Sequence, residues 1–141
     1  MAEAHTIQVD IVSAEGELFS GAASMVFAPA SQGDLGIAPR HAPLLTLLKA
    51  GEVTVQTPEG ERHHFFVGGG ALEVQPNKVT VLADTALRAK DLEESAALAA
   101  MQRAEETLSK ATDKIGQAEA MKEIVRMAEQ VKMIQRLRKG K

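Results

Sequence analysis

The chain has 141 residues, a formal net charge of −3 at pH 7 and no cysteine. This length allows one sizeable core, or one small domain with an appendage, and the lack of cysteine excludes disulfides and thiolate chemistry and favours a reducing cytoplasmic setting. We expect neither a secretory signal nor a transmembrane helix, because the sequence contains no suitable apolar run, so any work at a membrane must go through a partner.

Charge and turn residues divide unevenly along the chain. Residues 1–84 carry 4 Lys/Arg and 10 Asp/Glu, a net charge of −6, whereas residues 85–141 carry 12 and 9, a net charge of +3. All five prolines and nine of the eleven glycines lie in the first of these parts. We therefore expect two differently built domains, residues 1–86 and residues 87–141.

The first domain shows the period-2 alternation of β-strands. Ile7, Val9 and Ile11 alternate with polar residues, which places the apolar side chains on one face of a strand. The sequences "TPEG" at 57–60 and "QPNK" at 75–78 have the proline, glycine and asparagine that turns require. Several short strands over about 80 residues predict two antiparallel sheets packed face to face, a β-sandwich.

The second domain has the pattern of a helical hairpin. Asp91 as N-cap and Glu94 three residues later form a capping-box pattern, which predicts a first helix over about 92–110. A second helix is predicted over about 113–137, with a link around 111–116 that folds the two helices antiparallel. The apolar face of the first helix is mostly alanine, and a buried alanine contributes much less than the roughly 1.5–3 kcal/mol of a buried leucine. We expect the hairpin to be loosely held.

The stretch "GDLGIAPRHAPLLTLL" at 33–48 contains the most conspicuous candidate for chemistry, the pair Asp34 and His41. A hydrolase would also need a nucleophile, and Ser31 is the only nearby hydroxyl upstream, with no nucleophile elbow and no metal-ligand spacing. The favoured interpretation is a docking loop whose "LLTLL" segment is anchored in the core. A small hydrolase that uses Asp34 and His41 is the weaker alternative.

Two other stretches suggest sites that simpler explanations account for. His63 and His64 are adjacent, so in a strand they point to opposite faces and cannot share one metal ion. The glycines of "VGGGALEV" at 67–74 are not followed by the Lys-Ser/Thr of a phosphate loop, and a bulge or a close backbone approach explains them better. We expect no metal site.

The C-terminal sequence "KMIQRLRKGK" at 132–141 has five basic residues and no acidic one. Nucleic-acid binding is disfavoured because the whole protein is acidic and has no tryptophan or tyrosine. Two interpretations remain open, a solvated helix end favoured by its own dipole and a docking surface for an acidic protein. The residues concerned are Lys132, Arg136, Arg138 and Lys139.

Three segments in register carry a resemblance to a known family. "VSAEGELFSG" at 12–21, the stretch at 33–48 and "GGGALEVQPNKVTVLADTALRA" at 68–89, followed by the alanine-rich hairpin, resemble the epsilon subunit of the bacterial F-type ATP synthase. The resemblance covers residues 7–110 in order, while the second helix matches only in character. It implies a β-sandwich and two helices in a subunit without catalytic residues, which couples proton-driven rotation to ATP synthesis at the cytoplasmic face of the bacterial inner membrane.

The resemblance also implies partners and roles. The gamma subunit and the ring of proton-carrying membrane subunits would contact the sandwich, with Asp34 in place of the glutamate of the family's "GELG" and His41 as the histidine of its "GHAPL". Arg40 stands where the family commonly has glycine. In the family, the helices permit ATP hydrolysis when folded on the sandwich and inhibit it when extended along gamma to the alpha/beta head, so the basic second helix would be inhibitory.

Some family members bind ATP through the pattern Ile/Leu-Asp-x-x-Arg-Ala at the start of the first helix. Here the corresponding residues include Leu92, Glu93 and Ala97, with Arg103 as a further match, but Ala96 replaces the arginine. Losing one charge-assisted hydrogen bond costs roughly 1.5–3 kcal/mol, or about tenfold in affinity or more. We therefore expect at most weak nucleotide binding and no cofactor. A free-standing nucleotide-binding regulatory module is the alternative function.

Overall fold

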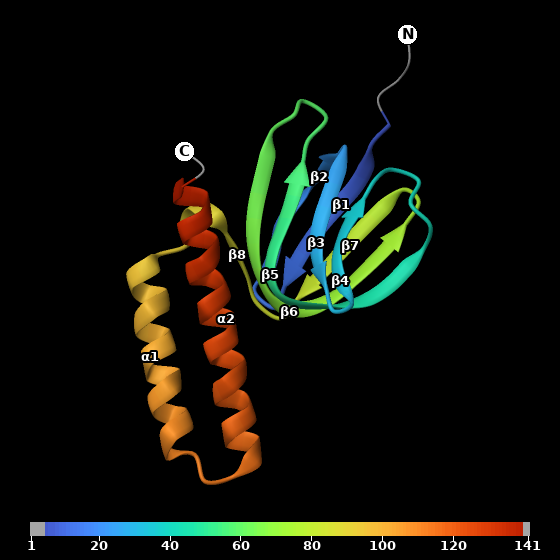
Figure 1. Ribbon diagram of the computed structural model, residues 1–141. Helices are drawn as coiled ribbons and strands as arrows, with labels where there is room; N and C mark the ends of the chain where they lie inside the picture. Colours follow the sequence, from blue (N-terminus) through green and yellow to red (C-terminus); the bar gives the residue numbers. More distant parts are fainter. Residues whose placement is uncertain (1–4, 140–141) are drawn as a thin grey trace. The chain divides into compact units, whose positions relative to one another are not determined.

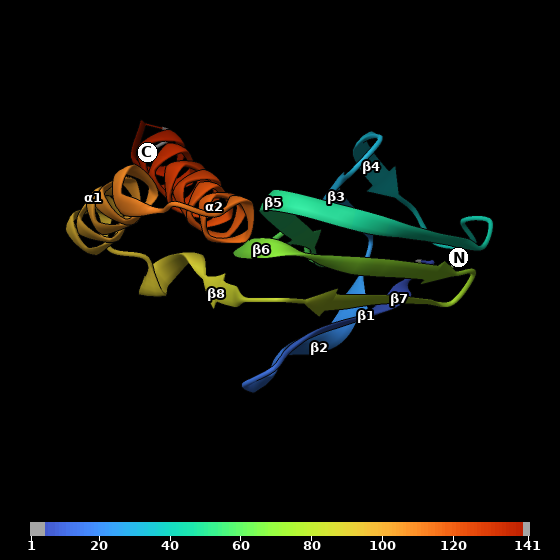
Figure 2. The same cartoon turned by 90° about the horizontal axis from the view of Figure 1, so that it is seen from below.

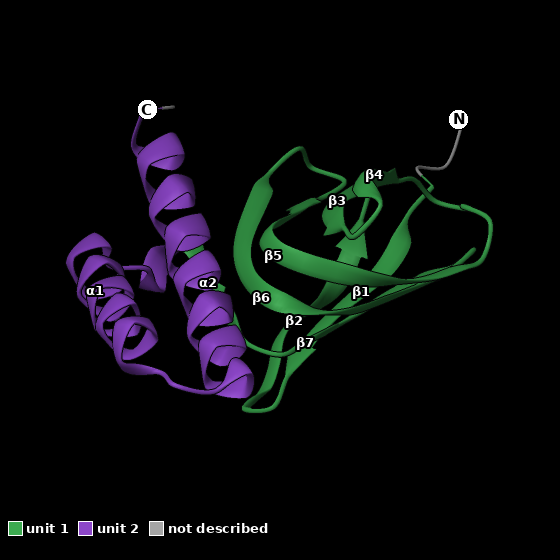
Figure 3. Cartoon of the chain, turned by 60° about the horizontal axis from the view of Figure 1, so that its bottom comes forward, with its two compact units in different colours: residues 1–89 green, residues 90–141 purple. Residues whose placement is uncertain are grey.

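The computed structural model describes residues 5–139, and its secondary structure changes type once along the chain. It divides into two compact units, residues 1–89 and residues 90–141 (Figure 3). The first, called the β unit below, contains strands; the second, the helical unit, contains two long helices. The predicted order of a β-sandwich followed by a helical hairpin is confirmed.

The β unit is built from eight strands, seven of which hydrogen-bond in the order β2-β1-β7-β6-β5-β3-β4, while the short β8 pairs with β6. Their bounds are β1 Ile7–Ser13, β2 Gly16–Ala23, β3 Met25–Ala30, β4 Gly33–Ile37, β5 Leu44–Gln56, β6 Arg62–Gln75, β7 Lys78–Ala83 and β8 Ala86–Arg88.

Two details of the strand pairing differ from the prediction. The strands form one continuous sheet rather than two separate ones. The long strands β5 and β6, of 13 and 14 residues, are curved, so that the two halves of the sheet enclose one core (Figure 1). The expectation of purely antiparallel pairing is also wrong, because β1 lies parallel to β7. Alternation of apolar residues reports which face is buried and carries no information on strand direction.

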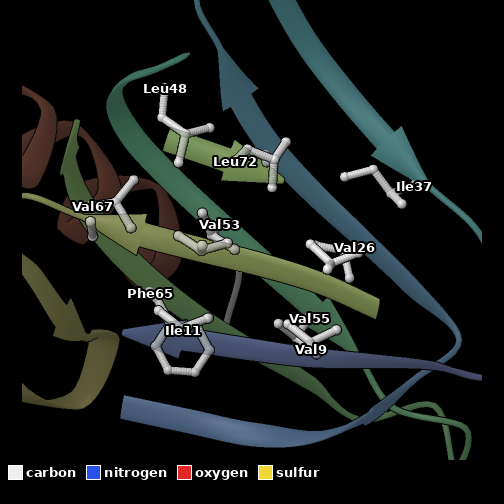
Figure 4. Close-up of a cluster of buried hydrophobic side chains, with 14 of the residues drawn as sticks. Val9, Ile11, Val26, Ile37, Leu48, Val53, Val55, Phe65, Val67 and Leu72 are labelled. Carbon is white, nitrogen blue, oxygen red and sulfur yellow. The ribbon is translucent and has the colours of Figure 1, made fainter. Parts of the chain in front are cut away.

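The core of the β unit is formed by the apolar faces that alternation predicted. Ile7, Val9 and Ile11 are fully buried, and so are Val53 and Val55 of β5. Side chains from β1, β3, β5 and β6 meet in this core (Figure 4). The two predicted turns, at 57–60 and 75–78, connect β5 to β6 and β6 to β7.

Gly70 confirms the close backbone approach expected in the glycine run. Its φ is +135°, and it pairs with Ala83 of β7. A Cβ atom at this position would overlap the carbonyl oxygen of Leu82. Only glycine therefore fits here, for both steric and conformational reasons.

A 3-10 turn, η1 (Ala89–Asp91), spans the boundary between the two units, and the helical unit contains the helices α1 (Glu94–Lys110) and α2 (Lys114–Lys139). Figures 1 and 2 both show the two helices running side by side as a hairpin. The side chains buried in this unit are few and mostly small, as the alanine pattern predicted: Ala97, Ala104, Ala120, Gln130 and Met133. No helix in the described residues is both long and apolar enough to cross a membrane.

The capping box predicted for the first helix is wrong. Asp91 lies in the 3-10 turn, and the helix begins later, with Glu93 as an N-cap whose side chain makes no capping hydrogen bond. The Glu94 carboxylate accepts hydrogen bonds from α2 instead. A contact between helices thus replaces the local contact that the sequence pattern suggested.

Candidate functional site

The stretch at 33–48 forms an edge strand, a tight loop and the start of a central strand. Its first part, β4, is antiparallel to β3 and lies at the end of the sheet, where Asp34 pairs in register with Pro29 and is exposed. The glycine-rich segment predicted as a surface loop is therefore a strand. An edge strand has one side without a strand partner, so a carboxylate on it is accessible to another chain.

Backbone hydrogen bonds hold the loop between β4 and β5 in place. The Arg40 amide donates to the carbonyl of Pro76, at 2.8 Å, and the His41 amide donates to the carbonyl of Ala38, at 3.2 Å. The His41 ring nitrogen Nδ1 lies 2.7 Å from the carbonyl oxygen of Ala42. This part of the stretch is a fixed turn, as a docking surface requires.

Arg40 has a backbone conformation that favours glycine. Its φ is +68°, and it is the only non-glycine with a positive φ in residues 5–139. The left-handed region costs a residue with a Cβ atom roughly 1–2 kcal/mol. Arginine is therefore strained at this position, and its side chain is exposed.

Relief of this strain can be measured. We expect Arg40→Gly to raise the free energy of unfolding by about 0.5–1 kcal/mol, because the roughly 1–2 kcal/mol of strain exceeds the roughly 0.4–1 kcal/mol that glycine costs through the unfolded chain. Ala42→Gly is the matched control and should be destabilising, since Ala42 has no positive φ to relieve. Urea denaturation followed by circular dichroism compares the two, and equal losses would show that Arg40 is not strained.

The structure does not join Asp34 to His41. Within the described residues, the side-chain contact of His41 is with its own loop, and no hydrogen bond or ion pair links it to Asp34. No group of three or more metal-binding side chains occurs in residues 5–139 either. His63 lies near Glu61 and Phe19, while His64 is 2.8 Å from a Glu52 carboxylate oxygen, so the two histidines have separate surroundings.

The segment "LLTLL" departs from the expectation that it is anchored in the core. Leu48 is buried and Leu44 packs against the core, but Leu45 and Leu47 are 74% and 66% exposed. Successive side chains of a strand point to opposite faces, so this run presents leucines to both faces of the sheet. In an antiparallel sheet with one face in water, the outer face is expected to be polar, so exposed leucines at these positions are unusual.

The exposed leucines are part of a row that crosses the sheet. Leu47 pairs in register with Ala71 of β6, and Ala71 pairs with Leu82 of β7, which is 53% exposed. Together with Leu45 these residues form what we call the outer stripe: Leu45, Leu47, Ala71 and Leu82. Sequence reasoning missed it, although the consecutive leucines at 44–48 were a usable signal.

A polar row lies beside the outer stripe on the same face. Its centre is Asp10 of β1, whose carboxylate accepts hydrogen bonds from Gln8 and Ser20 and lies 3.1 Å from the Lys78 ammonium. Hydrogen bonds from the Gln8 and Ser20 side chains, with the Lys78 charge, lower the pKa of Asp10. An apolar strip with a satisfied polar border has the anatomy of a protein interface.

Two of the four basic residues at the end of α2 form ion pairs within the helical unit. The Lys132 ammonium lies 3.3 Å from Glu129, and the Arg138 guanidinium lies 3.1 Å from Glu94 of α1. Arg136 also has a partner, and Lys139 is exposed at the end of the helix. From the sequence we expected these residues to be solvated or to dock on an acidic protein. In the structure two of them, Lys132 and Arg138, form ion pairs with glutamates of the same chain.

The residues of α1 and its N-cap that were compared with a nucleotide-binding pattern differ in burial and charge. Ala97 is buried in the hairpin and Ala96 carries no charge, while Glu93 and Arg103 are exposed. No phosphate-binding group therefore stands where the family pattern has its arginine. Weak nucleotide binding through these positions stays a prediction.

Comparison with known proteins identifies the family. Residues 6–89 match the family model described as "ATP synthase, Delta/Epsilon chain, beta-sandwich domain". The chain is 58% identical over 136 residues to the ATP synthase epsilon chain of Nitrosococcus oceani, covering 96% of this chain and 97% of that one. It is 55% identical to the epsilon chain of Halorhodospira halophila, over 95% and 96% of the two chains.

Solved structures share the fold at much lower sequence identity. A chain of the Euglena gracilis mitochondrial ATP synthase, in a structure of OSCP, F1 and c-ring, aligns with a TM-score of 0.76 at 13% identity, over 88% of this chain and 78% of that one. A chain of the central stalk and c-ring structure from Tetrahymena thermophila aligns with a TM-score of 0.67 at 14% identity, over 94% and 99%. On the family model and the near full-length identity to its bacterial relatives, this chain belongs to the ATP synthase epsilon chain family.

Proposed function

We propose that this chain is a non-catalytic subunit of the ATP synthase central stalk, which couples proton-driven rotation to ATP synthesis through the gamma subunit and the ring of proton-carrying membrane subunits. Membership of the epsilon chain family supports this, as does the fold shared with chains of assemblies described as central stalk and c-ring. The subunit belongs to a peripheral membrane complex, and we place it at the cytoplasmic face of the bacterial inner membrane.

The β unit, on this proposal, uses two surfaces for its two partners. The outer stripe binds gamma. Its leucines are 53–74% exposed, and covering this apolar surface with another protein removes it from water, which favours binding. Asp34 on the edge strand, with Arg40 and His41 in the adjoining turn, contacts the polar loops of the ring. The outer stripe is the observation that supports docking most directly.

A charge placed in the outer stripe tests docking on gamma. Leu47→Asp is expected to weaken binding to gamma at least about tenfold, since interface anchors typically contribute about 2 kcal/mol or more. The β unit should stay folded because Leu47 is 66% exposed. Titration of the purified chain onto gamma by calorimetry measures the change.

Leu87→Asp is the matched control for this variant. Leu87 is 39% exposed and lies in β8, so the same charge replaces a leucine of the β unit outside the outer stripe. Its affinity for gamma should be unchanged, and Leu47→Met should retain binding. An unaltered affinity for Leu47→Asp would contradict the assignment of this surface to gamma.

The helical unit, in the same proposal, inhibits ATP hydrolysis. Its second helix ends in Lys132, Arg136, Arg138 and Lys139, which suit an acidic surface on the alpha/beta head. At 1.5 Å per residue a helix of about 25 residues reaches roughly 38 Å, far enough to run from the stalk toward that head. The few small side chains inside the hairpin make release of α2 inexpensive.

A further inference from the structure

The open end of the hairpin is closed by a small polar cluster. Glu94 is the first residue of α1, and its carboxylate accepts hydrogen bonds from the Arg138 guanidinium, at 3.1 and 3.3 Å. The Gln135 side-chain amide donates a third hydrogen bond to the same carboxylate, at 3.1 Å. We call Glu94, Gln135 and Arg138 the clasp. The opposite end of the hairpin is closed by the chain itself, at residues 111–113.

Few side chains are fully buried near the open end of the hairpin. They are Ala97 and Met133, with Gln130 deeper in the hairpin, while Leu92, Ile134 and Leu137 are half-buried. Alanines make few apolar contacts, so Ala97 discriminates weakly between a closed and an open hairpin. The clasp adds a charged hydrogen-bonded contact between the two helices at this end, of the modest strength that a partly exposed pair has.

We propose that the clasp is the release catch of α2: when Glu94 holds Arg138 and Gln135, the last turns of the basic helix stay on α1, and loss of this contact frees them. Release of α2 is a competition for Arg138 between Glu94 and an acidic partner surface. A partner that binds Arg138 must displace Glu94, so docking of the basic end of α2 and opening of the hairpin are coupled. This regulatory consequence rests on the proposed inhibitory role, whereas the catch itself does not.

The charge state of Glu94 suits such a competition. The hydrogen bond from Gln135 contributes most to lowering the pKa of this carboxyl below its ordinary value of 4.5, followed by the hydrogen bond and charge of Arg138. The carboxylate is therefore ionised at neutral pH. Neighbouring Glu93 and Asp91 add negative charge beside it, and Arg136 and Lys139 add positive charge beside Arg138. A change of pH within the physiological range therefore does not neutralise Glu94, whereas a competing anionic surface can displace it from Arg138.

A distance measurement in the full chain tests the catch. The chain contains no cysteine, so Ser95→Cys and Lys132→Cys introduce two unique, exposed sites for spin labels, one on each helix. Pulsed dipolar spectroscopy then reports the fraction of chains with an opened hairpin. We expect Glu94→Gln to raise this fraction roughly twofold to fivefold, the range typical of solvent-exposed charge pairs.

The controls separate the clasp from general charge effects. Glu93→Gln removes the same charge from the same helix end, where negative charge favours the helix dipole, but Glu93 is exposed and its side chain makes no capping hydrogen bond. It should leave the open fraction unchanged. Arg138→Gln should raise the open fraction by no more than Glu94→Gln does, because it leaves the hydrogen bond from Gln135 to Glu94 in place. The double variant should open no further than Glu94→Gln alone, because the charged contact between Glu94 and Arg138 is lost in both single variants. Adding Arg138→Glu to Glu94→Arg should recover part of the closed population.

Two outcomes would overturn the proposal: an open fraction for Glu94→Gln no larger than for Glu93→Gln, or additive effects of Glu94→Gln and Arg138→Gln. Neither outcome depends on enzyme activity. If the inhibitory role were wrong, hydrolysis by the assembled complex would be insensitive to the helical unit, while the distances in the isolated chain would still respond to the clasp variants.

Discussion

Replacing Gly70 by alanine is expected to lower the free energy of unfolding of the β unit by about 3 kcal/mol or more. Two costs add at this position. The φ of +135° is a conformation that residues with a Cβ atom rarely adopt, which costs about 1–3 kcal/mol. The new Cβ would also overlap the Leu82 carbonyl, and the paired strands β6 and β7 would have to separate locally.

Gly33 offers a matched control that isolates the second cost. Its φ is also +135°, but a Cβ atom there would meet nothing within 4 Å. Gly33→Ala should therefore lose only the conformational part, about 1–3 kcal/mol. Urea denaturation followed by far-ultraviolet circular dichroism gives both values, since the chain has no tryptophan for fluorescence. Equal losses for the two variants would mean that the sheet absorbs the overlap at Gly70 without cost.

Ending the chain after Ala89 is expected to raise ATP hydrolysis by the assembled complex roughly fivefold or more, as removal of an inhibitory coupling of about 1 kcal/mol or more would. The cut falls where the two compact units meet in sequence, so the β unit remains complete. Its last strand, β8, keeps its pairing with β6, and Arg88 keeps its 2.7 Å hydrogen bond to the Leu18 carbonyl. Assembly with gamma should persist, as co-purification would show.

A second truncation locates the inhibitory part within the helical unit. Ending the chain after Lys110 removes α2 and its basic end but keeps α1. If the basic helix inhibits, this shorter change should raise hydrolysis as much as ending after Ala89 does. Unchanged hydrolysis with both truncations, each in a complex that still contains its truncated chain, would contradict the inhibitory role. A rise only when the chain ends after Ala89 would assign inhibition to α1.

The β core was predictable because its signal is local and repeated. Alternation at Ile7, Val9 and Ile11 reports the buried face from a few neighbouring residues, and the turn residues around 57–60 and 75–78 limit where strands can end. Neither signal contains strand direction or partner. The parallel pairing of β1 with β7, and the single curved sheet, could therefore come only from the assembled fold.

The candidate site was predictable in part. The stretch at 33–48 was interpreted as a docking loop, and its leucines were assigned to the core as a block. In the structure residues 33–37 form an edge strand, and backbone hydrogen bonds hold the turn at Arg40 and His41. Leu45 and Leu47 point away from that core, and their row with Leu82 exists only because β6 places Ala71 between them. The residues of a surface that crosses three strands are far apart in the sequence, so the spacing of residues along the chain cannot predict it.

The sequence by itself determined the order of the two units, the buried faces of the strands, the weak interior of the hairpin and the family. These properties follow from side-chain volume, alternation and helical period, which act over a few residues. The tertiary structure alone decided that Arg40 takes a glycine conformation, that leucines line an outer face, and that Glu94 binds Arg138 rather than capping its own helix. Each of these depends on groups far apart in the chain, or on a backbone shape that distant hydrogen bonds impose.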